Sequence, residues 1–327
     1  VFYVTATLDG RGNFIVSASD PGGSWSAPVW VPVGGIDPSL YFEDGRAWYC
    51  TNASLHPGRE EITLEEIDIQ TGALLSAPRT IWEGTGGGFL EGPHLYRIGD
   101  FCYLMAAEGG SNFNHMITVA RSRSLFGPYE SCPHNPILTN AWDTSKQVQC
   151  AGHGDLFQDH RGNWWIIHLA TRLSRRTMTH LGRETFLTPV HWEEGWPCVG
   201  WESSASYSPG QKKAALLCDG PLWAPRKEVP AWEPDLNSSA WEPEWIFLRR
   251  PDCSRYRKGN GRLRITPSEV TFREKGSPSF AAVRQPDFDC VIEISFTFEP
   301  DCTGDEAGLA VLLSSEFHYR AGKKKTA

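Results

Sequence analysis

Three segments of the sequence share one layout, and this internal repeat limits the fold more than any other feature. They are IDPSLYFEDGRAWYC from Ile36, LEGPHLYRIGDFCYLM from Leu90 and AGHGDLFQDHRGNWWIIHL from Ala151. Each begins with a polar residue beside Gly or Pro, continues as an apolar strand, turns at Gly and returns as an aromatic strand. Repeats of this length are typical of the four-stranded blades of a β-propeller. We therefore predict a propeller.

The remaining local signals also favour strands. Hairpin turns are indicated at 9–14, 43–46 and 160–165, where Asp-Gly or Arg-Gly-Asn separates apolar runs. The segment ITLEEIDIQ at 62–70 is the one candidate for a helix, but its imperfect alternation predicts another strand. The chain is therefore expected to be all-β.

Composition excludes several classes of function. With 31 Lys+Arg against 39 Asp+Glu, the net charge of -8 argues against nucleic acid or an anionic membrane as the partner. No run approaches the roughly 18 apolar residues of a membrane span, and VFYVTATL lacks the features of a signal peptide, so we expect a soluble chain. The nine Cys form no C-x-x-C pair, which excludes a zinc ribbon and a thioredoxin-type motif. Compartment and oligomeric state stay open.

A change in composition divides the chain. All 14 Trp lie at or before Trp245, and the stretch from Asp219 to Trp245 contains five prolines, which exclude helix and central strand. We predict a propeller over 1–218, a Pro-rich linker over 219–243 and a β-sandwich over 244–327. In the last region, the longer alternating segments 247–266, 277–300 and 306–320 predict strands.

The repeat also indicates where chemistry lies. The first strand of every propeller blade lines the central channel, so Asp37, Glu91 and His153 should converge there. A desolvated Glu91 facing the charge of Asp37 would stay protonated near neutral pH, as a general acid requires. Arg172 offers a guanidinium fork for sugar hydroxyls, or alternatively an ion pair with Glu184. Each of these residues also has a purely structural interpretation, as a turn residue or a satisfied polar group.

Several motifs in order resemble glycoside hydrolase family 43, the five-bladed propeller β-xylosidases and α-L-arabinofuranosidases. The motifs are IDPSLYF, EGPHLY, AEGG with NHMITVARS, GPYE with NPILT, GHGDLF, WWIIHLATR and LGRETFLTPVHWEEGWP. The segments FLRRPDCSRY, EKGSPSFAAVRQPDFDC and EAGLAVLLSSEFHY resemble the concanavalin A-like sandwich that follows the propeller in many β-xylosidases of this family. The resemblance implies a five-bladed propeller and a sandwich, and we expect that the chain lacks the first blade and the end of the sandwich.

The resemblance also implies roles for individual residues. Glu91 matches the general acid, and Asp37 matches the carboxylate that tunes and orients it. His153 matches the channel histidine, beside which some relatives hold a metal ion such as calcium, and Arg172 matches a substrate-binding arginine. Leu173 stands where many relatives have proline, which makes the pose of that arginine less certain.

The family inverts, and its general base lies in a Y-P-D-P-S-type motif that does not occur ahead of Asp37. We therefore expect a hydrolase of xylan- or arabinoxylan-derived oligosaccharides whose isolated chain is weakly active or inactive. No organic cofactor is implied. The alternative is a non-catalytic carbohydrate-binding propeller protein.

Overall fold

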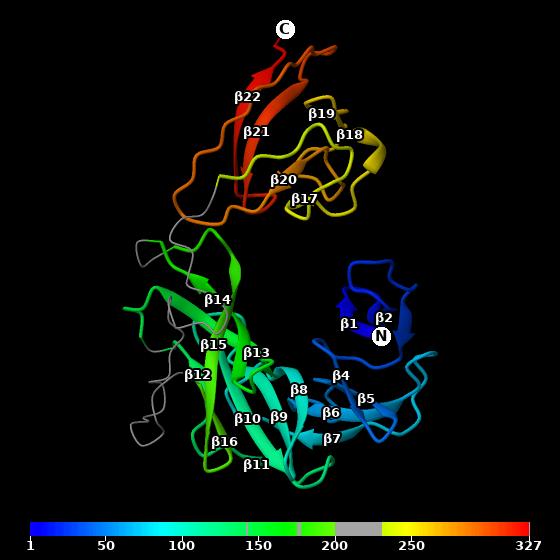
Figure 1. The fold of residues 1–327 in the computed structure, drawn as a ribbon, viewed down its shortest axis with the longest axis vertical. Helices are drawn as coiled ribbons and strands as arrows, with labels where there is room; N and C mark the ends of the chain where they lie inside the picture. Colours follow the sequence, from blue (N-terminus) through cyan, green and yellow to red (C-terminus); the bar gives the residue numbers. More distant parts are fainter. Residues whose placement is uncertain (142, 175–177, 200–230, 327) are drawn as a thin grey trace. The chain divides into compact units, whose positions relative to one another are not determined.

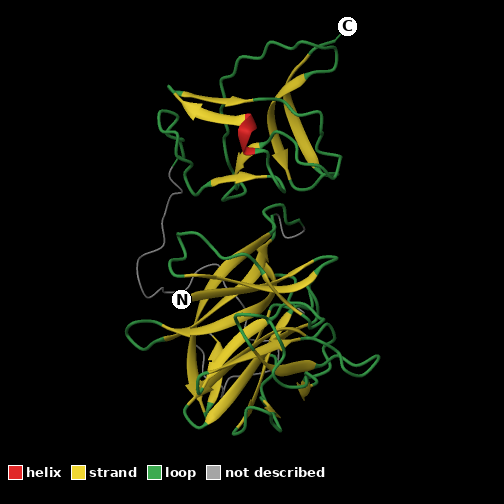
Figure 2. Cartoon of the chain, turned by 90° about the vertical axis from the view of Figure 1, so that its right-hand side faces the viewer, coloured by secondary structure: helices red, strands yellow, loops and turns green. Residues whose placement is uncertain are grey.

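The computed structural model describes residues 1–141, 143–174, 178–199 and 231–326, and nearly all of its regular elements are strands (Figures 1 and 2). These ranges contain one helical element, the short 3-10 helix η2 (Cys253–Arg255) (Figure 2). Within the same ranges, no helix has the length and hydropathy that a membrane crossing demands. The chain divides into two compact units, Val1–Met178 with Arg183–Pro225, and Thr179–Gly182 with Arg226–Ala327.

The described residues of the first unit form four antiparallel sheets, each built from strands that follow one another in the sequence (Figure 1). The first sheet contains β1 (Phe2–Leu8), β2 (Gly12–Ala18) and β3 (Val29–Val31), and the second contains β4 (Ser39–Glu43), β5 (Arg46–Thr51), β6 (Ile62–Ile67) and β7 (Arg79–Trp82). The third contains β8 (Glu91–Ile98), β9 (Phe101–Glu108), β10 (Met116–Ser122), β11 (Glu130–Ser131) and β12 (Leu138–Thr139). The fourth contains β13 (Val148–Gln158), β14 (Trp164–Arg172), β15 (Arg183–Glu193) and β16 (Trp196–Val199). The four sheets form a propeller-like arrangement of four blades, which confirms the predicted all-β propeller class.

Local signals in the sequence explain these hairpins. The β1–β2, β4–β5 and β13–β14 turns fall at the three predicted positions, and each contains a glycine with a φ of 74° to 82°, in the left-handed region. The segment predicted as a strand rather than a helix is β6. Turn chemistry and alternation, which are both local in the sequence, therefore account for these hairpins.

The core lies between the blades. Along β9 the buried side chains alternate: Leu104 and its neighbours at i±2 pack toward the second sheet, whereas Tyr103 and Met105 pack toward the fourth. Burial on both faces explains why this strand is an uninterrupted apolar run, and each fully buried large side chain contributes roughly 1.5–3 kcal/mol. The innermost strands are brought together as a result, since β8 contacts both β4 and β13.

The described residues of the second unit form three antiparallel strand pairs. Strand β17 (Trp245–Phe247) pairs with β20 (Ala281–Val283), β18 (Tyr256–Gly259) with β19 (Arg262–Ile265), and β21 (Glu306–Leu312) with β22 (His318–Lys324). Of the predicted segment 277–300, β20 forms a strand, whereas 291–300 contains none. No neighbouring strand in the described ranges pairs with 291–300, and Val291 is 88% exposed. In the predicted linker, 231–243 contains no strand, and 219–230 lies outside the described residues.

Candidate functional site

Asp37, Glu91 and His153 meet although they come from three different blades. Asp37 lies two residues before β4, Glu91 is the first residue of β8, and His153 lies within β13. One carboxylate oxygen each of Asp37 and Glu91 and one ring nitrogen of His153 lie within 4.8 Å of one another, and His153 Nδ1 is 3.9 Å from Asp37 Oδ2. All three side chains are partly exposed, so the group is accessible to a ligand.

The backbone around this group is held in unusual conformations. Asp37 has a φ of +52° and His153 a φ of +46°, a region that side chains other than glycine rarely adopt. The β13 register shifts at His153, where the strand bulges between Gln149 and Gly154. Gly92 leaves room for the imidazole, since a Cβ there would come within 2.6 Å of His153 Nε2. Such conformations cluster at functional sites and need support from the surrounding structure.

The pKa of Glu91 is raised above the ordinary glutamate value. Burial is the main cause, and the negative charge of Asp37 is the second. Glu60 adds to the rise, and the positive charge of Arg183 opposes it. A carboxyl group in this setting can remain protonated at a higher pH than a free glutamate and donate its proton to a bound ligand.

Two further histidines border the group, and the sequence analysis did not select them. The rings of His94 and His153 have centroids 6.5 Å apart, and His94 Nδ1 is 3.8 Å from Asp155 Oδ1. Burial lowers the pKa of both His94 and His115. His115 Nδ1 lies 3.1 Å from the carbonyl of Cys150, whereas its buried Nε2 has no hydrogen-bond partner among the described residues. The sequence signal for His94 was the Gly-Pro pair of the EGPH motif, which lies where β8 bulges between Glu91 and His94.

Two arginines on neighbouring strands have different surroundings. Arg172, at the end of β14, donates from Nε and Nη2 to the carboxylate of Glu184, each at 2.8 Å. This is the ion pair that the sequence analysis gave as the alternative for Arg172. Arg183, the first residue of β15, is the arginine whose charge acts on Glu91 and on His115, and the sequence analysis did not select it. The sequence signal that could have indicated Arg183 was its position next to Glu184.

The group of Asp37, Glu91 and His153 has the residue types of a metal site, because it brings together two carboxylates and one imidazole nitrogen. Calcium takes six to eight ligands, so water would have to supply most of them here. The channel ion expected beside His153 stays a prediction.

A second group of metal-ligand types, His191 with Glu193 and Cys198, lies on the β15–β16 hairpin. Its ligand atoms also lie within 4.8 Å of one another. A hydrogen-bond contact of 2.8 Å between His191 Nε2 and Glu193 Oε1 explains the proximity of two of the three without an ion.

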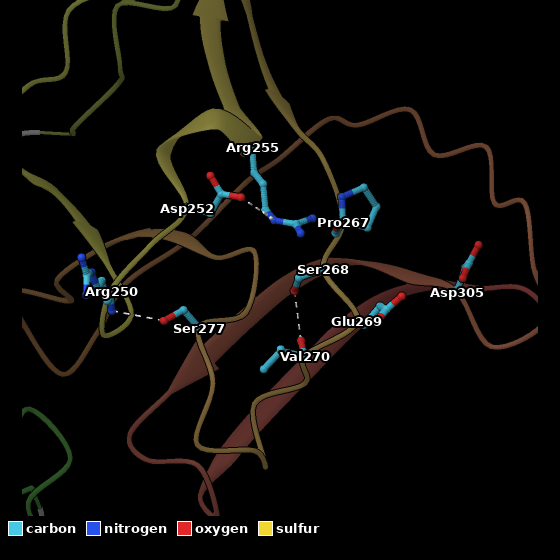
Figure 3. Close-up of a pocket in the computed structure, with 9 residues that line it drawn as sticks. All are labelled: Arg250, Asp252, Arg255, Pro267, Ser268, Glu269, Val270, Ser277 and Asp305. Atoms are coloured by element: carbon cyan, nitrogen blue, oxygen red, sulfur yellow. Dashed lines mark hydrogen bonds and ion pairs between the residues drawn. The ribbon is translucent and has the colours of Figure 1, made fainter.

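A pocket of about 630 Å³ opens in the second unit (Figure 3). Its lining residues carry mixed charges and include no aromatic side chain; they are Arg250, Asp252, Arg255, Pro267, Ser268, Glu269, Val270, Ser277 and Asp305. Arg255 Nε lies 3.3 Å from Asp252 Oδ2, so two of the charges already compensate each other. Without an aromatic platform for a sugar ring, this pocket provides no argument for carbohydrate binding.

Two family models match parts of the chain. Residues 1–197 match the model of glycosyl hydrolases family 43, and residues 234–327 match that of the beta xylosidase C-terminal concanavalin A-like domain. A non-reducing end alpha-L-arabinofuranosidase of Bacteroides ovatus is 36% identical over 97% of this chain and 59% of its own length. A xylosidase/arabinosidase of Butyrivibrio fibrisolvens is 33% identical over 97% of this chain and 63% of its own.

A solved structure, described as Bacteroides ovatus xyloglucan PUL GH43B, superposes with a TM-score of 0.83 at 34% identity. The match covers 98% of this chain and 62% of the chain in that structure. The chain therefore spans about three fifths of the length of these relatives, with values of 59% to 63%.

Proposed function

Because the chain belongs to glycosyl hydrolases family 43, as the motifs in its sequence predicted, we propose that it acts as a glycoside hydrolase. The proposed substrates are xylan- or arabinoxylan-derived oligosaccharides, from which terminal xylosyl or arabinofuranosyl units are removed. The names of the relatives, an arabinofuranosidase and a xylosidase/arabinosidase, support both sugars. The observation that carries the proposal is the convergence of Asp37, Glu91 and His153 around a carboxyl group with a raised pKa.

Glu91 is the proposed general acid. Its proton passes to the glycosidic oxygen as the bond from that oxygen to the anomeric carbon breaks, and a water molecule attacks the opposite face in a single, inverting displacement. Asp37 keeps Glu91 protonated before the reaction, because two neighbouring carboxylates resist being ionised together. Once the proton has left, the positive charge of Arg183 stabilises the new carboxylate.

His153 and Arg172 are the proposed substrate-binding residues. The imidazole of His153 lies beside Asp37, where it can hydrogen-bond to a hydroxyl group of a bound sugar. The pair with Glu184 fixes the orientation of the Arg172 guanidinium, which favours a defined contact over a mobile one.

Inversion also needs a base, a second carboxylate roughly 6.5–9.5 Å from the acid with room for a water. The Y-P-D-P-S-type motif that would supply it does not occur in this sequence. We therefore propose that this chain by itself turns over slowly, and that a small external anion speeds it by attacking the anomeric carbon without needing a base.

The test is hydrolysis of nitrophenyl β-D-xyloside, nitrophenyl α-L-arabinofuranoside and xylobiose by this chain, with and without sodium azide. Azide should raise the rate and give a glycosyl azide of inverted configuration. Glu91→Gln should reduce the rate on xylobiose by about 10²- to 10⁴-fold and affect the nitrophenyl substrates less, because a good leaving group needs little protonation. Glu83→Gln, which changes an exposed carboxylate, is the control and should have no effect.

If no substrate is cleaved with or without azide, yet the chain binds xylo-oligosaccharides, the carbohydrate-binding alternative replaces the hydrolase. If Glu91→Gln slows all three substrates equally, Glu91 is not the acid.

A further inference from the structure

Asn52 connects the two segments that carry the carboxylates of the site. It follows β5 directly, and its side-chain oxygen accepts a hydrogen bond from the backbone N–H of Ile36 at 2.6 Å. Its amide nitrogen donates to the backbone carbonyl of Leu90 at 3.2 Å. Ile36 immediately precedes Asp37, and Leu90 immediately precedes Glu91. One side chain therefore bridges the backbones on which both carboxylates are mounted.

The Asp37 side of this bridge is held twice. The buried hydroxyl of Thr51 donates to the carbonyl of Ile36 at 2.9 Å, so consecutive residues bind both backbone groups of Ile36. Asp37 then takes its left-handed φ of +52°, which an aspartate keeps only where surrounding contacts enforce it. The contact is also tight, since a Cβ on Gly35 would come within 2.7 Å of the side-chain oxygen of Asn52.

The Glu91 side is held from two directions as well. The Leu90 carbonyl accepts from Asn52. The Leu90 N–H donates to Glu60 Oε2 at 3.4 Å, and the Phe89 N–H donates to Glu60 Oε1 at 2.7 Å. The peptide groups before Glu91 are therefore fixed relative to those before Asp37. An amide suits this bridge because it is both donor and acceptor, whereas a carboxylate only accepts.

We propose that Asn52 is a positioning residue for the site, and that its amide fixes the separation of Asp37 and Glu91 by joining the residues that precede them. This inference rests on the proposed function and deepens it. The separation matters because the interaction between two charges falls with distance, and solvent that enters a loosened site weakens it further. Loss of the bridge should therefore make Glu91 behave more like an ordinary glutamate.

The experiment measures the pKa of Glu91 directly by ¹³C NMR of its side-chain carboxyl group, with the signal assigned by its loss in Glu91→Gln. Asn52→Ala should lower the pKa of Glu91, since both its burial and its proximity to Asp37 decrease. Thr51→Val keeps the side-chain shape and removes only the bond to Ile36, so it should lower the same pKa by less. If Asn52→Ala does not fold, Thr51→Val decides the question by the direction of its change.

Asn135→Ala is the matched control. The Asn135 amide binds both backbone groups of Val119, each at 2.9 Å, so its loss removes the same number of amide–backbone hydrogen bonds elsewhere in the first unit. The pKa of Glu91 should not change in this variant. The proposal is wrong if a folded Asn52→Ala leaves the pKa of Glu91 at the wild-type value, or if Asn135→Ala lowers it equally. Because the measurement needs no turnover, its failure is distinct from a failure of the hydrolase proposal.

Discussion

We predict that Glu65 makes the free energy of unfolding depend on pH. It lies in β6 with an exposed fraction of 0%, and neither carboxylate oxygen has a hydrogen-bond partner among the described residues. Burial raises its pKa from the ordinary 4.5 to about 7, and the Thr63 hydroxyl opposes this rise. At neutral and higher pH the folded chain must bury either an unpaired charge or a proton taken from solution.

The sign and size follow from linkage. Below about pH 4.5 Glu65 is protonated in the folded and the unfolded chain, so its full contribution to stability is present there. As the pH rises from 4.5 through about 7, the folded chain binds the proton more tightly than the unfolded chain, and the free energy of unfolding falls. A difference of about 2.5 in pKa corresponds to about 3 kcal/mol, reached by pH 8.

The assay is urea unfolding of the wild type and Glu65→Gln at pH 5 and pH 8. A buried amide carries its own constant cost of about 1–3 kcal/mol, so only the change in the difference between the two proteins counts. Relative to the wild type, Glu65→Gln should gain about 2.5 kcal/mol between these two pH values, because the wild type has already lost part of the total at pH 5. A difference that stays constant from pH 5 to pH 8 would refute the reasoning, because it would mean that Glu65 is ionised in both states.

Two further substitutions test the site itself. Asp37→Asn removes the charge that helps keep Glu91 protonated, so the pKa of Glu91 should fall and the alkaline limb of the pH–rate profile, measured with azide present, should move to lower pH. Gly92→Ala should lower stability in thermal unfolding by more than the ~1 kcal/mol of a left-handed alanine, because its Cβ would also displace His153. Gly99→Ala has the same φ of +58° but no atom within 4 Å of the added Cβ, so an equal loss in both variants would show that the imidazole does not occupy that space.

Much of the fold was predictable because its signals are local. Glycines with left-handed φ, alternation and apolar runs determine hairpins within about 20 residues, and the repeat of such hairpins predicts blades. The same repeat indicated that Asp37, Glu91 and His153 converge, because equivalent positions in successive blades face one axis. The segment 291–300 shows the limit of this approach, since alternation favours a strand but only a partner strand completes it.

The parts of the site that sequence reasoning missed depend on contacts between blades. Asn52 follows an ordinary strand, and nothing beside it in the sequence shows that its amide reaches Leu90, 38 positions away. Arg172 and Arg183 are both strand-terminal arginines near Glu184, and only the packing of β14 against β15 shows which one pairs with Glu184 and which one acts on Glu91. Hydrogen-bond partners of this kind follow from the tertiary structure.

A raised pKa does not by itself identify the general acid. Glu65 and Glu91 both have a raised pKa for the same main reason, burial, yet Glu65 is fully enclosed and cannot reach a ligand. Glu61 shows the opposite outcome, because burial opposes ionisation there but hydrogen bonds from its neighbours lower its pKa to about 2. Glu91 differs from both because it is partly exposed and has a ligand atom within 4.8 Å of those of Asp37 and His153. The backbones of Asp37 and His153 are strained, with left-handed φ values. The convergence of these groups, and not the pKa alone, is what assigns the proposed chemistry to Glu91.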